Sequence, residues 1–353
     1  MNQKELSEIK TIGVIGWGLM GDVLMRTPVL RALREIFPNA RIVVSVDPVG
    51  EEVLRYNPDI DNILVFDRKK RPKWKYIFNK LKGWKDIKAE NFDLMIDLYS
   101  GSSSSMLIRL SGVKRKIGFR HLQLKSNIYD ILIPNEFETA STPHLSKQLL
   151  KIISIFEKNF EEYSVKPIFI THTMTDKKMK QYLDSFSLDK TYLLNFGSGG
   201  VEKILSSDKS FEQVKFLYDT YGYSPLVICN PGQEVLQKNF VEKYLTPASI
   251  PYAALNVLSL EEIGSLMKLN DFIITPDTGL YHIAVAIGIP IIGIFTYTNP
   301  LLVEPESGLF IHCFQPDPKT VDNPMSFGKK DLDLDYLIGC TEQLVKQVLE
   351  TNR

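Results

Sequence analysis

Residues 271–300, DFIITPDTGLYHIAVAIGIPIIGIFTYTNP, read as a strand, a turn, a helix and a second strand. A short apolar run at 272–275 predicts a buried strand, and the turn chemistry of PDTG ends it. Apolar spacing over 280–287 favours a helix, which Gly288 and Pro290 terminate before a β-branched run at 291–295. This order of elements is typical of half of a doubly wound parallel sheet, so the fold class expected is α/β.

The turn in this stretch is a candidate ligand site. Asp277, Thr278 and Gly279 follow the first strand and open the helix, and ligands of such sheets bind at the carboxyl ends of the strands. Unpaired amides and the helix dipole favour an anion of the phosphate type there. Asp277 can equally be a simple helix cap. On spacing alone, both interpretations stay open.

Length and composition indicate a protein of two globular domains. The chain has 353 residues, of which 44% are hydrophobic and 24% charged. It has no apolar run of 18 residues, and its charged start lacks the apolar segment of a signal peptide. Cys229, Cys313 and Cys340 are far apart, as expected of reduced thiols. These features predict a cytoplasmic protein.

Strand and helix patterns alternate along both halves of the chain. In the first half we expect strands at 11–16, 41–46, 63–66, 94–98, 116–119 and 128–133, and helices at 22–37, 51–56, 102–110 and 144–160. In the second we expect strands at 192–196, 226–229 and 252–256 and helices at 211–221, 234–244, 260–268 and 334–349, besides the opening stretch. The pattern lapses at 164–176, which predicts domains at 1–170 and 171–353. Residues 299–330 are rich in Pro and Gly and predict a surface loop.

Charge is divided unevenly between the halves, although the net charge is zero. Residues 1–180 hold 30 Lys and Arg against 21 Asp and Glu, whereas residues 181–353 hold 12 against 21. The first domain is therefore expected to contact something anionic.

The turn after the first strand carries a glycine motif. Gly16, Gly18 and Gly21 match the dinucleotide-binding pattern between a strand and a helix, which makes an NAD(P)-dependent hydroxyacid-type dehydrogenase one hypothesis. Two acidic residues disagree with it. Asp47 lies 26 residues beyond Gly21, further than the usual position of the ribose-binding acid, and Asp22 places a negative charge where a pyrophosphate would bind.

A second hypothesis comes from two longer motifs. GLMGDVLMRTPVLRALREIFPNARIVVSV at 18–46 with NPDID at 57–61, and DTGLYH at 277–282, resemble the two signatures of glycosyltransferase family 9, the heptosyltransferases of lipopolysaccharide synthesis. NFGSGG at 195–200 is similar to the Asn-Pro-Gly turn of that family, and FTYTNP at 295–300 stands where the family has Phe-Gly-Pro-Thr-x-Pro. The resemblance covers nearly the whole chain in the family's order.

The resemblance implies a GT-B enzyme: two Rossmann-like doubly wound domains facing across a cleft, with the acceptor on the first and the nucleotide-sugar on the second. It implies inverting transfer of a sugar, in the first instance heptose from an ADP-linked donor, onto a lipopolysaccharide-core-type acceptor. Because a sugar hydroxyl is a weak acid, a carboxylate base is needed, and the motif assigns this role to Asp22 on the loop of Gly18 and Gly21. A nucleotide-sugar-binding protein without catalysis is the other alternative.

The leaving diphosphate needs positive or hydrogen-bonding partners. The motifs suggest Asp277, Thr278, Gly279, His282, Ser198 and a lysine. The lysine is ambiguous between Lys203 and Lys209, and Lys209 is preferred because Phe211 then occupies the family's aromatic position. Asp331, Asp333 and Asp335 form a D-x-D-x-D run that we interpret as the solvated start of the last helix, so no metal and no cofactor is predicted.

A basic stretch at 68–88 is the remaining feature. It holds ten Lys and Arg against one acid, with apolar residues at helical spacing. Its apolar stripe can pack on the domain's own sheet, or its basic face, with Lys69, Lys70 and Arg71, can contact an anionic lipid-linked acceptor at the inner membrane surface. Nucleic acid is not expected, because the rest of the domain lacks a matching basic patch.

Overall fold

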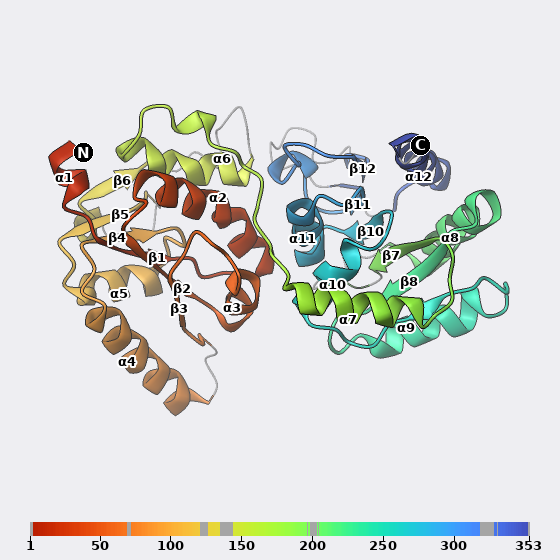
Figure 1. Cartoon of the computed structure of the whole chain (residues 1–353), viewed down its shortest axis with the longest axis horizontal. Coiled ribbons are helices and arrows are strands. Elements are labelled where there is room, and N and C mark those ends of the chain that lie inside the picture. Colours follow the sequence, from red (N-terminus) through yellow and green to blue (C-terminus); the bar gives the residue numbers. More distant parts are fainter. Residues whose placement is uncertain are drawn as a thin grey trace. The chain divides into compact units, whose positions relative to one another are not determined.

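The chain divides into two compact units, Met1–Phe169 and Ile170–Arg353 (Figure 1). The computed structural model describes residues 3–68, 72–120, 126–134, 144–195, 197, 203, 205–317, 328–329 and 331–351. The side chains of residues 3, 4, 73–78, 80 and 126 lie outside this description.

The first unit is built on a parallel six-stranded sheet of order β3-β2-β1-β4-β5-β6. Its strands are β1 (Thr11–Ile15), β2 (Arg41–Val46), β3 (Asn62–Val65), β4 (Leu94–Asp97), β5 (Arg115–Phe119) and β6 (Ile131–Ile133). Its helices are α1 (Gln3–Ser7), α2 (Met20–Ile36), α3 (Pro48–Leu54), α4 (Lys73–Ala89), α5 (Ser102–Ser111) and α6 (Leu145–Leu150), with short 3₁₀ turns at Ser126–Ile128, Lys151–Ile155 and Phe160–Glu162. Helices α2 and α6 cover one face of the sheet, and α4 and α5 cover the other (Figure 1).

The second unit has a parallel sheet of order β12-β11-β10-β7-β8-β9. Its strands are β7 (Thr191–Asn195), β8 (Ser224–Ile228), β9 (Ala253–Ala254), β10 (Ile273–Pro276), β11 (Ile291–Phe295) and β12 (Phe310–Phe314). Its helices are α7 (Thr173–Asp184), α8 (Ser207–Tyr221), α9 (Glu234–Phe240), α10 (Leu260–Met267), α11 (Gly279–Ile287) and α12 (Leu334–Thr351), with a π turn at Val241–Leu245 and a 3₁₀ turn at Pro300–Leu302.

Both sheets have the strand order of a Rossmann fold, which confirms the predicted doubly wound α/β class. In each sheet the chain reverses its direction of winding between two central strands, β1 and β4 in the first and β7 and β10 in the second. The carboxyl ends of these pairs are where such folds bind ligands. The candidate sites are therefore the turns after these four strands.

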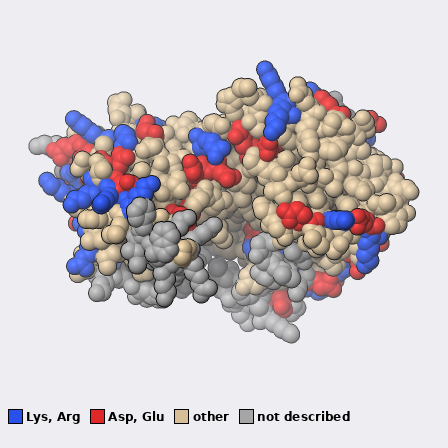
Figure 2. All heavy atoms as spheres, turned by 90° about the horizontal axis from the view of Figure 1, so that it is seen from below, with Lys and Arg blue, Asp and Glu red and all other residues tan. Residues whose placement is uncertain are grey.

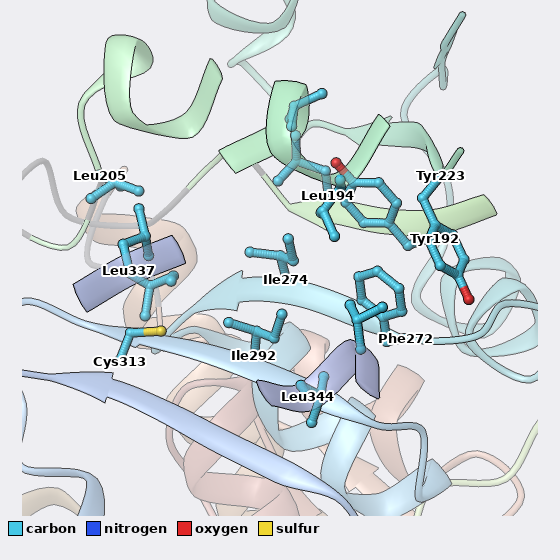
Figure 3. Packing of buried hydrophobic residues seen from close by; sticks show 14 of the residues in the cluster. Tyr192, Leu194, Leu205, Tyr223, Phe272, Ile274, Ile292, Cys313, Leu337 and Leu344 are labelled. Atoms are coloured by element: carbon cyan, nitrogen blue, oxygen red, sulfur yellow. The ribbon is translucent and has the colours of Figure 1, made fainter. Parts of the chain in front are cut away.

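The β-branched and aromatic runs of the sequence form the cores. In the second unit, Tyr192 stacks on Phe272 with ring centroids 4.9 Å apart, and Tyr223 meets Phe272 edge-on (Figure 3). All three rings are fully buried, and each contributes roughly 2–3 kcal/mol of hydrophobic stabilisation relative to exposure. This packing fixes the amino ends of β7 and β10 and so holds the turns at their other ends.

The Thr-Pro pair inside α2 is compensated by side chains. Pro28 has no N–H for the carbonyl of Leu24, and Thr27 Oγ1 donates to that carbonyl at 2.7 Å instead. The same hydroxyl accepts the amide of Ile168 at 2.8 Å. Thus the proline in α2 leaves the carbonyl of Leu24 hydrogen-bonded, and the helix is hydrogen-bonded to Ile168 near the end of the first unit.

The structure differs from three expectations. Residues 299–330 contain the edge strand β12 and are therefore not only a surface loop. Residues 164–176 contain the start of α7, a largely polar helix with one fully buried residue, Met179, so it lacks the apolar stripe that predicts helices. The helix expected at 144–160 ends at residue 150 and continues as 3₁₀ turns, in which Ile152 and Ile153 are buried.

Candidate active site

The turn after β10 is held in place by Asn195, the last residue of β7. Asn195 Nδ2 donates to Thr275 Oγ1 at 2.9 Å and to Thr278 Oγ1 at 3.2 Å, and its Oδ1 accepts the amide of Gly197. The amide thereby links the two strand ends at the point where the sheet reverses its winding. The predicted residues Thr278 and Gly279 are the N-cap and the first residue of α11.

The start of α11 has the features of an anion site. Among the residues that the structure describes, none accepts a hydrogen bond from the amides of Thr278 or Gly279. These amides and the helix dipole favour a negatively charged group in front of the helix. Thr278 lies here as the sequence predicts, and its side chain makes no cap hydrogen bond to a described residue.

Asp277 is a buried carboxylate surrounded by donors. Its Oδ2 accepts Lys203 Nζ at 2.7 Å and Thr298 Oγ1 at 2.6 Å, and His282 Nε2 lies 4.0 Å from Oδ1. Burial raises the pKa of Asp277, but the charge of Lys203, these hydrogen bonds and the charge of His282 outweigh burial, so its pKa is lowered. Asp277 therefore stays ionised and orients the cation of Lys203 at the helix start.

Lys209 has a different environment. Its Nζ contacts Asp331 Oδ1 and donates to the carbonyl of Leu332 at 2.6 Å, next to the start of α12. The structure therefore brings Lys203, and not the preferred Lys209, into contact with Asp277.

The D-x-D-x-D run lies at the start of the last helix. Its Asp333 accepts hydrogen bonds from Lys329 Nζ and Gln315 Nε2, and the described residues contain no cluster with metal-ligand geometry. Ser198 lies outside the described residues.

In the first unit, Asp22 lies in the first turn of α2 and is exposed. Its Oδ2 accepts the amide of Leu19 at 2.9 Å, the geometry of half a capping box. Within the described part of the chain, Oδ1 accepts no hydrogen bond, so this oxygen is available to a substrate proton. The carboxylate also occupies the helix start that a dinucleotide pyrophosphate would need, which disfavours the dehydrogenase hypothesis.

Gly18 is required by the conformation of this turn. Its φ is +153°, and a Cβ there would lie 2.7 Å from Asp22 Oδ2. Its amide donates to Asp47 Oδ2 at 2.8 Å, and Arg68 binds both oxygens of Asp47 at 2.6 and 2.7 Å. Gly21 lies within the first turn of α2. The turn is therefore held by Asp47 through the amide of Gly18.

Two residues at this edge were not predicted from the sequence. Asp97, at the end of β4, is fully buried; burial raises its pKa, although Tyr129 Oη donates to it at 2.6 Å. Arg26 lies one turn after Asp22 on α2. Two sequence signals could have indicated these residues. Asp97 is an acidic residue at the end of a buried strand where the sheet reverses its winding. Arg26 is a cation four residues after the expected base. In the second unit Thr298 was also missed; it follows β11 at the same strand edge.

The stretch 69–71 lies outside the described residues. The second half of α4 packs on the first sheet: Ile87 is buried, and a Cβ at Gly83 would contact the ring of Phe66. Trp84 Nε1 donates to the carbonyl of Leu110 in α5 at 2.8 Å. The described part of the chain has no helix that is both long and apolar enough to cross a bilayer.

Two Rossmann-like units, each with a candidate site at its strand ends, are the architecture of the GT-B fold. The model of glycosyltransferase family 9 (heptosyltransferase) matches residues 80–325, and the chain therefore belongs to this family. The chain is therefore a glycosyltransferase, and the comparisons do not favour a dehydrogenase.

Related proteins cover most of the chain. Lipopolysaccharide core heptosyltransferase OpsX of Haemophilus influenzae is 22% identical over 308 residues, 85% of this chain and 83% of that protein. The family 9 glycosyltransferase structure from Veillonella parvula superposes with a TM-score of 0.80 at 20% identity, covering 96% of this chain and 97% of the other. The Escherichia coli ADP-heptose lipopolysaccharide heptosyltransferase II has a TM-score of 0.76 at 17% identity, covering 97% and 98%. These structures share the fold.

Proposed function

We propose that the protein transfers heptose from ADP-heptose to a hydroxyl of a lipopolysaccharide-core-type acceptor, with inversion at the anomeric carbon and Asp22 as the general base. The observation that carries this proposal is the geometry of Asp22. One of its oxygens is anchored by the amide of Leu19, and the other has no hydrogen bond within the described residues. An oriented, exposed carboxylate of this kind can take the proton of a bound hydroxyl.

In the proposed reaction, the acceptor oxygen bonds to the anomeric carbon while its proton passes to Asp22. The bond between that carbon and the diphosphate oxygen breaks, and ADP leaves with the electron pair. Lys203, the amides of Thr278 and Gly279, and His282 stabilise the negative charge on the diphosphate. Because these groups supply positive charge and hydrogen bonds, we expect transfer without a metal ion. ADP is proposed because the related Escherichia coli enzyme is an ADP-heptose transferase.

We further propose that the first unit binds the acceptor and the second the donor. A basic surface supports this. Lys82, Lys85 and Lys88 on α4 and Arg109 on α5 are exposed beside the exposed apolar side chains of Leu81, Met106 and Leu110. Figure 2 shows Lys and Arg side chains gathered on the first unit. This composition suits an anionic lipid-linked saccharide at a membrane surface, and it supports the proposal that the enzyme acts at the inner face of the cytoplasmic membrane.

The test is transfer from ADP-heptose to lipopolysaccharide whose core lacks heptose, followed by ADP release and by the mass of the product. Asp22→Asn should fold and bind ADP as the wild type does, with kcat reduced about 10²–10⁴-fold. Product formation unaffected by Asp22→Asn would refute the base assignment. ADP binding without any transfer would instead indicate a binding protein, and equal use of UDP- or GDP-linked sugars would refute the ADP preference.

A further inference from the structure

A half-buried arginine lies one helical turn beyond the proposed base. Arg26 follows Asp22 by four residues on α2, so both side chains leave the same face of the helix. A Cβ at Gly18 would lie 2.7 Å from Asp22 Oδ2 and 2.8 Å from Arg26 Nη1. The carboxylate and the guanidinium therefore approach the same point beside the main chain of the glycine turn.

The guanidinium ties α2 to the end of β1. Nη1 of Arg26 donates to the carbonyl of Trp17 at 2.5 Å and to that of Gly16 at 3.2 Å. These carbonyls belong to the turn that leads from the strand into the first residues of the helix. A shift of the turn relative to the helix would break both bonds, so Arg26 restricts the backbone that carries Asp22.

Placing the Arg26 guanidinium at this position costs free energy, which is unexpected for a side chain that only stabilises the fold. Burial lowers the pKa of Arg26, while Asp22, Asp97 and Asp47 attract its charge and Arg68 repels it. An arginine nevertheless stays protonated in proteins. Nε is buried and has no hydrogen-bond partner within the described residues. Unsatisfied buried donors are rare in native proteins and indicate that another requirement fixes the group.

We propose that Arg26 is a positioning residue of the transfer reaction, which holds the Gly16–Gly18 turn against α2 so that Asp22 meets the acceptor hydroxyl in a fixed orientation. The inference rests on the proposed function, because it takes Asp22 as the base. In this proposal Arg26 does not contact the donor. Its loss should therefore lower the rate of the chemical step and leave donor binding unchanged.

The variants Arg26→Ala and Arg26→Lys test this in the full chain. Transfer is measured from ADP-heptose to lipopolysaccharide whose core lacks heptose, and ADP affinity by calorimetry. For Arg26→Ala we expect kcat to fall at least 30-fold, with less than a twofold change in the Kd for ADP, and for Arg26→Lys a partial recovery of kcat. Millimolar guanidinium ion should raise kcat of Arg26→Ala in a saturable manner and have no such effect on the wild type. Millimolar guanidinium is too dilute to change the global stability of the protein, so a saturable rescue reports on the Arg26 position itself.

Arg34→Ala is the matched control. Arg34 lies on the same helix, and its Nη1 also donates to main-chain carbonyls, of Ala40 at 2.7 Å and Pro38 at 3.3 Å. We expect lower thermal stability and wild-type kcat in its folded fraction.

Two results would overturn the inference. One is a wild-type kcat in Arg26→Ala. The other is a fall in kcat of Arg26→Ala that guanidinium does not rescue and that Arg34→Ala shows to the same extent. If Arg26→Ala fails to fold, Arg26→Lys decides: reduced kcat with unchanged ADP affinity supports the inference, and wild-type kcat overturns it. Wild-type activity in Asp22→Asn would refute the proposed base separately, whatever the Arg26 variants do.

Discussion

Lys203 Nζ lies 2.7 Å from Asp277 Oδ2 and 3.2 Å from the carbonyl oxygen of the same residue. One ammonium group thus binds both the side chain and the main chain at the start of α11. The pair joins residues 74 positions apart in the sequence, and it places a cation next to the amides of Thr278 and Gly279, for which the described residues supply no acceptor.

Lys203→Met should therefore weaken ADP binding. A hydrogen bond to a charged group contributes about 1.5–3 kcal/mol, so we expect the Kd for ADP to rise roughly 10- to 150-fold. Lys209→Met is the matched control, since Lys209 contacts Asp331 and the Leu332 carbonyl; it should change the melting temperature and leave the Kd within twofold. Calorimetric titration with ADP measures both. A larger effect of Lys209→Met would restore Lys209 as the donor-binding lysine.

Gly18→Ala should impair catalysis more than folding. The positive φ of +153° disfavours an L-residue, and the new Cβ would meet Asp22 Oδ2 and Arg26 Nη1 within 3 Å. We expect a loss of about 1–3 kcal/mol in stability and at least a tenfold lower kcat. Gly16→Ala is the control, because a Cβ there has its nearest neighbour, Val44, at 3.4 Å. Equal kcat values for the two variants would show that the turn does not position Asp22.

Neutralising Lys69, Lys70 and Arg71 to Gln should weaken binding to vesicles. Each basic residue near an anionic surface contributes about 1 kcal/mol, so the triple variant should bind vesicles containing anionic phospholipid roughly 10²-fold more weakly at low salt. Binding is measured by co-sedimentation, with purely zwitterionic vesicles as the reference.

The control for this surface changes the same charge elsewhere. Lys177, Lys178 and Lys180 are exposed residues of α7 in the second unit. Their replacement by Gln should leave vesicle binding unchanged. If both triple variants bind equally, net charge alone governs association, and the basic stretch only packs on its own sheet.

The alternation of buried strands and amphipathic helices was sufficient to predict the fold. Strands such as β11, IIGIF, are buried at every position, because both faces of a parallel sheet are covered. Edge strand β12, FIHCF, follows a segment with several Pro and Gly residues and is only partly buried. It lacked the pattern of a central strand, and its pairing with β11 is a tertiary property.

The candidate site was predictable where it follows strand ends. Asp277 and Thr278 come directly after an apolar run, so their place at the sheet edge followed from local pattern. The choice between Lys203 and Lys209 could not be made in this way, because it depends on a contact with Asp277 across many residues. Likewise, the two carbonyls that Arg26 binds are main-chain atoms, which leave no signal in the amino-acid types.

His312 gives the second unit a pH-dependent stability. Burial lowers its pKa to about 4, with partial opposition from the charge of Asp277, and its Nε2 lies 2.7 Å from Tyr281 Oη. An unfolded chain binds the proton near pH 6.5. Between about pH 6.5 and 4 the unfolded state therefore holds more protons, and stability falls as pH is lowered through this window, by at most roughly 3 kcal/mol.

His312→Gln removes the titrating group and keeps an acceptor for Tyr281. We expect urea unfolding followed by circular dichroism to show a weaker loss of stability from pH 7 to 4.5 than in the wild type. Trp17, Trp74 and Trp84, the three tryptophans of the chain, lie in the first unit, so tryptophan fluorescence provides an internal control whose pH dependence should not change. The pKa of Asp277 is lowered, so this carboxyl affects the pH dependence of the free energy of unfolding only below about pH 4. An unchanged slope in His312→Gln over this range would mean that folding does not lower the pKa of His312.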